Sequence, residues 1–151
     1  MRWKVNPVLV IVLLIVVSLT LIGFVLFSPG NQAERIVDQF YSYEQQGKFA
    51  ESYNLFHSSM KERFEKGYYL QDRAHVFMNH FGVTTFSYSL SKANRLENWQ
   101  MSEEAEPLEV VYQVTVTQSY KGKYGNFALV QDVFATKEDD NWTVLWNYQQ
   151  Q

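Results

Sequence analysis

Residues 108–120 read LEVVYQVTVTQSY, and this stretch decides the fold class of the chain. Apolar side chains recur at every second position, at Val110, Tyr112, Val114 and Val116. Gln113 and other polar residues fill most of the positions between them. Alternation of this kind is typical of a strand with one buried face and one solvated face. We therefore predict a long strand here, in an antiparallel sheet.

The flanking sequence predicts the rest of that sheet. A glycine-containing hairpin loop at 121–126 follows the long strand, and an acidic turn occupies 137–141. On the N-terminal side, alternation over 86–90 and a weaker pattern over 94–101 predict two strands that pair with each other. The expected strands are therefore 86–90, 94–101, 108–120, 127–136 and 142–148.

Between residues 32 and 81 the apolar residues repeat at helical spacing instead. The expected helices are 32–46, 49–56, 60–66 and 73–81, with Gly47, Gly67 and Gly82 at three of their ends. Helices followed by a meander of strands are the order of an α+β fold. We expect three to four helices packed on a curved antiparallel sheet, whose other face stays open to solvent or a partner.

The N-terminal sequence predicts a membrane anchor. Residues 7–27 carry no charge, and about 20 apolar residues suffice to cross a hydrocarbon core of roughly 30 Å. Arg2 and Lys4 precede the run, so we expect the N-terminus in the cytoplasm. Bulky residues end the run, which favours an uncleaved signal-anchor over a cleaved signal peptide. The expected units are 1–29, the cytoplasmic tip and anchor, and 30–151, one extracytoplasmic domain.

Composition indicates the cellular compartment of that domain and the partners it can bind. The chain has no cysteine, which excludes disulfides and favours a bacterial envelope over an animal extracellular space. All 16 acidic residues and 11 of the 13 basic ones follow residue 30, so the domain carries a net charge of −5. Nucleic acids and anionic lipids both bind best to clusters of positive charge, so neither is the expected main partner.

Two motifs carry a family resemblance. Residues 49–56, FAESYNLF, resemble the second helix of nuclear-transport-factor-2-like (cystatin-like α+β) domains, and residues 140–146, DNWTVLW, resemble their closing strand. The combination is most similar to the N-terminal non-catalytic domain of MecA-type penicillin-binding proteins. That resemblance implies a cone-shaped domain between a membrane and a catalytic unit. The sequence stops at Gln151, so we expect no transpeptidase and carry over no acylation chemistry.

Catalytic candidates are few. Some enzymes of the resembled superfamily, isomerases and dehydratases, use an Asp or His base with a Tyr donor in the cone. The matching residue types here are His80, Asp132, Tyr88 and Tyr112, with Phe134 on the strand face of Asp132. Nothing in the spacing fixes their mutual geometry. His75 and His80 are five residues apart and on different faces of a helix, so we expect no metal site and no cofactor.

Trp142 and Trp146 share one face of the last predicted strand, about 13 Å apart. One interpretation is a platform on which sugar rings stack, and the other is packing against the helices. The sequence alone does not decide between these interpretations, and packing against the helices is the commoner role of such a pair.

The expected function is a non-enzymatic binding or scaffold module of the cell envelope, held on the membrane by a single pass. The expected partner is a cell-wall enzyme, another envelope protein, a glycan strand or a second copy of the chain. One alternative is an assembly subunit of a secretion or conjugation machine, because such machines use the same layout. A second is a small-pocket enzyme of the isomerase or dehydratase kind.

Overall fold

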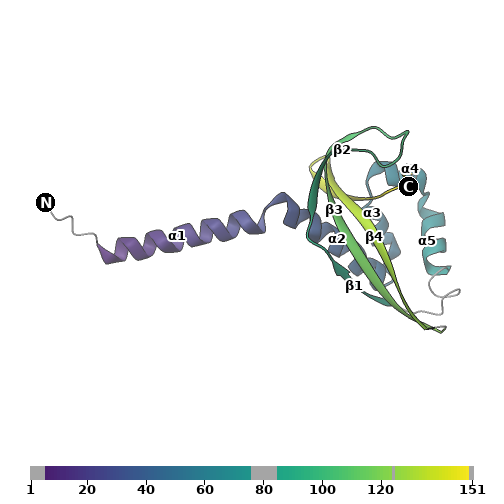
Figure 1. The fold of residues 1–151 in the computed structure, drawn as a ribbon, viewed down its shortest axis with the longest axis horizontal. Coiled ribbons are helices and arrows are strands. Elements are labelled where there is room, and N and C mark those ends of the chain that lie inside the picture. The colour runs from purple at the N-terminus through teal and green to yellow at the C-terminus, as the bar shows by residue number, and fades with distance from the viewer. Residues whose placement is uncertain (1–5, 76–84, 124, 150–151) are drawn as a thin grey trace.

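The structure, a computed structural model, describes residues 6–75, 85–123 and 125–149. Helix α1 (Pro7–Leu26) projects away from the rest of the chain (Figure 1). Its 20 residues span about 30 Å, the thickness of a hydrocarbon core. None of the apolar window Pro7–Phe24 is buried. α1 is thus long and apolar enough to cross a membrane, as an anchor or as a signal sequence.

Helix α2 (Pro29–Gln45) follows α1 after only Phe27 and Ser28. Ser28 caps it, because its hydroxyl accepts from the backbone N–H of Asn31, and Pro29 has the fixed φ that suits a first helical turn. The buried residues of α2 form one stripe at three- and four-residue spacing: Ala33, Val37, Phe40, Tyr41 and Glu44. This stripe packs on the sheet.

Three short helices complete the helical layer: α3 (Phe49–Asn54), α4 (Ser58–Arg63) and α5 (Lys66–His75). The predicted boundaries of the last two were wrong. Extended backbone at Phe64 ends α4, and Gly67 lies in the first turn of α5 rather than at a helix end. The earlier start of α5 places Tyr69 and Arg73 one turn apart, and both contact Glu44. The rest of the predicted helix, 76–81, lies outside the described residues.

The sheet is antiparallel and has five strands: β1 (Phe86–Leu90), β2 (Asn94–Trp99), β3 (Leu108–Gly122), β4 (Gly125–Glu138) and β5 (Asn141–Trp146). The expected pairing of β1 with β2 is wrong. Both pair with β3, which is 15 residues long, so that β1 takes its C-terminal half and β2 its N-terminal half. On its other edge β3 pairs with β4, and β4 pairs with β5.

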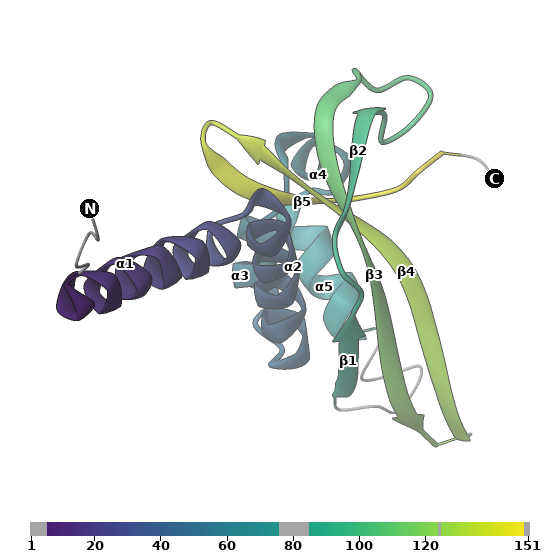
Figure 2. The same cartoon turned by 60° about the vertical axis from the view of Figure 1, so that its left-hand side comes forward.

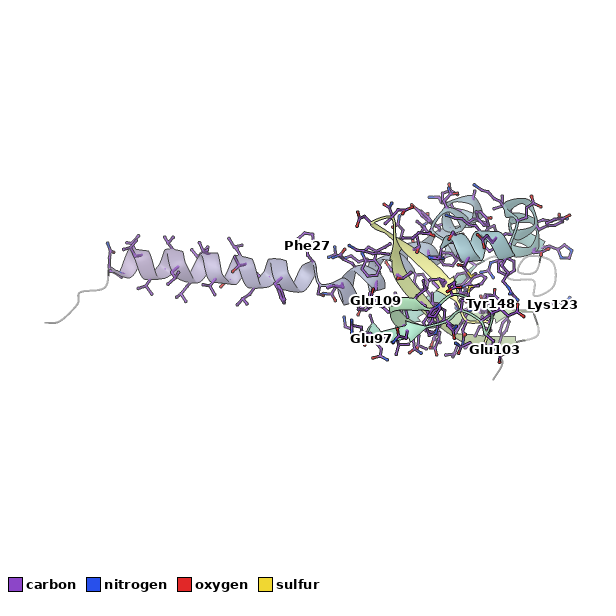
Figure 3. All side chains as sticks on the ribbon, turned by 90° about the horizontal axis from the view of Figure 1, so that it is seen from above. Phe27, Glu97, Glu103, Glu109, Lys123 and Tyr148 are labelled. Atoms are coloured by element: carbon purple, nitrogen blue, oxygen red, sulfur yellow. The ribbon has the colours of Figure 1, made fainter. Side chains whose placement is uncertain are left out.

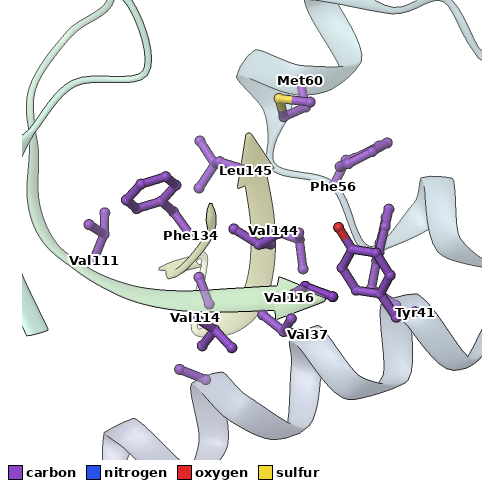
Figure 4. Packing of buried hydrophobic residues seen from close by; sticks show 14 of the residues in the cluster. Val37, Tyr41, Phe56, Met60, Val111, Val114, Val116, Phe134, Val144 and Leu145 are labelled. Carbon is purple, nitrogen blue, oxygen red and sulfur yellow. The ribbon is translucent and has the colours of Figure 1, made fainter. Parts of the chain in front are cut away.

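The inner face of the sheet packs against α2, and both lie in the close view of Figure 4. Val114 and Val116 of β3 and Val144 of β5 are fully buried there together with Val37. Residues 55–57 add to the edge of β5, because His57 N–H donates to the Val144 carbonyl and Val144 N–H to the Leu55 carbonyl. The predicted α+β class, with helices on one face of a curved antiparallel sheet, is confirmed, and it is compatible with a nuclear-transport-factor-2-like fold (Figure 2).

A smaller apolar cluster covers one end of the outer face. Trp99 stacks on Phe134 with ring centroids 4.1 Å apart, and Val111 and Leu145 are fully buried on the same face. Asn98 adopts a positive φ of 52° and directly precedes Trp99, the cluster residue at the end of β2. The rest of the outer face keeps exposed or half-buried side chains.

Candidate functional site

The open part of the outer sheet face is built from small side chains. Ser87 and Ser89 of β1, Thr117 and Ser119 of β3, and Val130 of β4 share this face through the strand register. Val130 leaves 65% of its surface exposed, and no charged residue stands among these five. Short side chains lose little conformational entropy when a contact orders them, so this face suits contact with a molecule that can hydrogen-bond to its hydroxyls.

Two of the catalytic candidates, Asp132 and Tyr112, lie on opposite faces of the sheet. Asp132 stands opposite Thr115 and accepts a hydrogen bond from its hydroxyl at 2.6 Å, on the exposed outer face. Tyr112 stands opposite Ala135 on the inner face. Positions 112 and 115 differ by an odd number of residues along one strand, so their side chains point apart. The structure does not bring this acid and this tyrosine together.

The other candidates are equally dispersed. The Tyr88 hydroxyl donates to Asp38 of α2 at 2.9 Å, and burial, followed by this hydrogen bond, raises the pKa of Tyr88 to about 12. Phe134 is buried in the cluster with Trp99. His80 lies outside the described residues. A base and a proton donor facing one cavity is the arrangement that catalysis of this kind needs, and the described candidates do not form it.

Trp142 and Trp146 have separate environments. Trp146 packs into the core, with its ring centroid 5.0 Å from that of Phe56 and 6.1 Å from that of Phe40. Trp142 is half-buried at the surface and meets Tyr112 edge-on, with ring centroids 5.7 Å apart. Both side chains are half-buried, Trp146 against core aromatic rings and Trp142 against Tyr112.

Two grooves flank Trp142. The first, which we name the anchor groove, has a volume of about 470 Å³ and is lined by Pro29, Leu108, Glu109, Val110, Tyr112, Thr136, Lys137 and Trp142. The second has a volume of about 530 Å³ and is more polar. Its lining residues are Ile36, Asn54, Leu55, Lys61, Glu138, Asp139, Asn141, Trp142 and Thr143. Both volumes fall within the range of about 300–1,000 Å³ typical of small-molecule sites.

A buried polar network lies inside the helical layer, and the predicted sites did not include it. The Glu44 side chain is fully buried and forms an ion pair with Arg73, whose Nε donates to Oε2 at 2.6 Å. The hydroxyls of Ser52 and Tyr69 donate to the other oxygen, Oε1. Burial and the nearby carboxylate raise the pKa of Tyr69 well above its usual range.

A signal for this network is present in the sequence. Glu44 follows Phe40 by four residues and Val37 by seven, so it belongs to the apolar stripe of α2. An acidic residue on such a stripe needs a buried partner. Because both carboxylate oxygens of Glu44 already accept from α3 and α5, the network ties three helices together rather than presenting a free base.

No protein-family model matches the chain, and no curated protein sequence matches it. The outer face of the sheet and the two grooves at Trp142 are candidate binding surfaces among the described residues.

Proposed function

We propose that this protein is a single-pass, membrane-anchored, non-enzymatic binding or scaffold module on the outer side of the bacterial cytoplasmic membrane. The observation that carries the proposal is the junction between α1 and the domain. The apolar helix α1, which buries none of its residues over Pro7–Phe24, is joined by Phe27 and Ser28 alone to a folded α+β domain. So short a connection holds the domain against the membrane surface.

The charge pattern supports the proposed orientation. Arg2 and Lys4 lie before the apolar helix, and the neutral residues Ser28, Pro29 and Gly30 lie after it. Basic residues near a membrane-spanning helix favour the cytoplasmic side. The acidic domain is then outside, where the absence of cysteine in the whole chain fits an envelope protein that folds without disulfides.

The outer sheet face is the proposed partner surface, and the proposed partners are envelope proteins or glycans of the cell wall. The helices cover the inner face, whereas Thr117, Ser119 and Val130 leave part of their surface to solvent. The resemblance of residues 49–56 and 140–146 to nuclear-transport-factor-2-like domains, and to the non-catalytic domain of MecA-type penicillin-binding proteins, supports a role in spacing or recruitment.

One observation favours the assembly-subunit alternative. β5 pairs only with residues 133–138 of β4, so residues 128–132 lack a second strand neighbour among the described residues. Leu129 and Val130 in this segment are 47% and 65% exposed. An exposed apolar edge is a template for pairing with another chain. A secretion or conjugation machine built from such subunits would use this edge.

A photo-crosslinking amino acid at position 117 tests the wall-related module against the assembly subunit in living cells. Thr117 lies on the outer face, and the exposed Gln71 on α5 is the matched control position. Cell-wall synthesis enzymes or wall fragments captured from position 117, and not from 71, support the wall-related module. Self-crosslinks or subunits of one transport complex support the assembly subunit. Equal capture from the two positions would remove the outer face as the partner surface.

A further inference from the structure

The anchor groove lies where α2 leaves the proposed membrane anchor. Pro29, which lines it, is three residues beyond Leu26, the end of α1. Three residues span at most about 11 Å even when fully extended. The headgroup layer on each side of the hydrocarbon core is roughly 5–7 Å thick. The groove therefore opens at the level of the lipid headgroups or just above it.

The view from above agrees with this position (Figure 3). In Figure 3, Glu97 and Glu109 lie at the end of the domain nearer α1, and Lys123 lies at the far end. Glu109 lines the groove, and Glu97 stands opposite Val110 in the adjacent strand.

The domain is also held to the anchor by side-chain bonds. The amide of Gln32 donates to the backbone carbonyl of Phe27 at 2.6 Å, and its oxygen accepts from the indole N–H of Trp142 at 2.9 Å. One wall of the groove is thus hydrogen-bonded to the residue at which the anchor ends. The groove cannot turn away from the membrane without breaking this connection.

The lining groups match a zwitterion. Lys137 is exposed, lies with its Nζ 5.9 Å from the centroid of the Trp142 ring, and belongs to none of the ion pairs found among the described residues. Trp and Tyr rings attract cationic groups to their faces and are enriched at membrane interfaces.

We propose that the anchor groove holds the headgroup of a zwitterionic phospholipid from the leaflet that α1 enters, an inference that rests on the proposed membrane anchoring. Lys137 meets the phosphate, and the Trp142 ring meets the ammonium group. The groove offers one cation beside an aromatic ring rather than a basic cluster, and a domain of net charge −5 is better suited to a zwitterionic lipid than to an anionic one. Headgroup binding fixes the height and tilt of the domain.

The test uses the full-length protein in phosphatidylcholine nanodiscs that contain headgroup-spin-labelled lipid. Because the chain lacks cysteine, a single fluorophore can be placed through Glu97→Cys near the groove, or through Ser119→Cys at the far end of β3 as the control. We expect strong quenching from position 97 and little from 119. Lys137→Glu should lower the docked fraction about tenfold, the effect of losing one charged hydrogen bond.

Lys121→Glu is the matched control, because it makes the same charge change at an exposed position at the far end of β3. Equal quenching from positions 97 and 119, or equal quenching in the Lys137→Glu and Lys121→Glu proteins, overturns the proposal. Quenching that soluble peptidoglycan fragments abolish by competition would assign the groove to a glycan instead and also overturn it. Flotation with vesicles tests anchoring separately: a protein that floats but shows no quenching at 97 disproves only the lipid site.

Discussion

The indole N–H of Trp142 donates to the side-chain oxygen of Gln32 across 110 residues of sequence, at 2.9 Å. Gln32 in turn donates to the carbonyl of Phe27, so one side chain links the last strand to the end of the apolar helix. The orientation of the domain relative to α1 therefore depends on a residue that is neither in the core nor in the anchor.

Gln32→Ala should loosen this orientation while the domain stays folded. We expect a loss of about 1 kcal/mol in the free energy of unfolding, typical of a half-buried hydrogen bond. The anisotropy of a fluorophore at position 97 in nanodiscs should fall. Gln39→Ala is the control, because the Gln39 amide donates only within α2, to Tyr43. Equal anisotropy in the two variants would contradict the link.

The Glu44–Arg73 pair should dominate the stability of the helical layer. Arg73→Met leaves a fully buried carboxylate without its cation, and we expect a loss of about 3–5 kcal/mol in urea unfolding. Adding Glu44→Gln should recover part of that loss, because the double variant no longer buries an unpaired charge. Arg95→Met, which removes an exposed ion pair with Glu97, should have no measurable effect. Additive losses at positions 44 and 73 would disprove the coupling.

His57 should make the domain less stable in mild acid. Its Nδ1 accepts from the Ser59 N–H at the start of α4, and burial lowers the pKa of His57 below the ordinary 6.5 although Glu138 opposes the shift. The unfolded chain therefore binds the proton first, and stability falls as the pH drops through 6.5 toward the folded value.

His57→Asn keeps a capping side chain and removes the titration. The melting temperature of this variant should depend less on pH between about 7.5 and 5 than that of the parent protein. Glu138 titrates below this pH range and so does not contribute to the expected change. Partial burial opposes its ionisation, but hydrogen bonds from Ser58 and the nearby His57 hold its pKa below the ordinary 4.5. Parallel pH profiles for the two proteins would contradict the assignment to His57.

Gln118→Met should be neutral or stabilise the domain by about 1 kcal/mol. Gln118 is 2% exposed on the apolar face of β3, and its Nε2 has no hydrogen-bond partner among the described residues. Methionine fills a similar volume without a buried amide. Thermal unfolding checks this, with Gln113→Met on the half-exposed outer face as the control. A clear loss of stability specific to position 118 would show that the amide is satisfied.

Thr117→Arg should abolish partner capture without unfolding the domain. The arginine would project from the outer face, where Thr117 stands opposite Val130. We expect normal melting and loss of the crosslinked species, whereas Gln71→Arg on α5 should retain them. If both variants keep every interaction, the outer face does not bind the partner.

The sequence predicted strand faces better than strand partners. Alternation in residues 108–120 placed Val114 and Val116 inward correctly. It could not place Asp132 relative to Tyr112, because the two residues lie on different strands and their faces depend on the register between β3 and β4. Strand pairing was harder to predict. Nothing in the local sequence of strand 86–90 shows that β1 and β2 both pair with the same edge of the 15-residue strand β3. The start of α5 depends on Glu44, a residue more than 20 positions away, so local periodicity placed it too late.

The segment 55–57, which bonds to Val144, also limits how many neighbours the sheet can accept. It occupies the edge of β5, so a strand from another molecule cannot join there. At the opposite side of the sheet, β1 and β2 are two separate strands. Between them, the Glu34 carboxylate accepts hydrogen bonds from the Ala93 N–H and from Lys92. Among the described residues, strand addition is left to the free part of β4 and to the outer edges of β1 and β2, which pair with β3 alone. The edges of β1 and β2 are five and six residues long, and such short edges limit pairing with another chain.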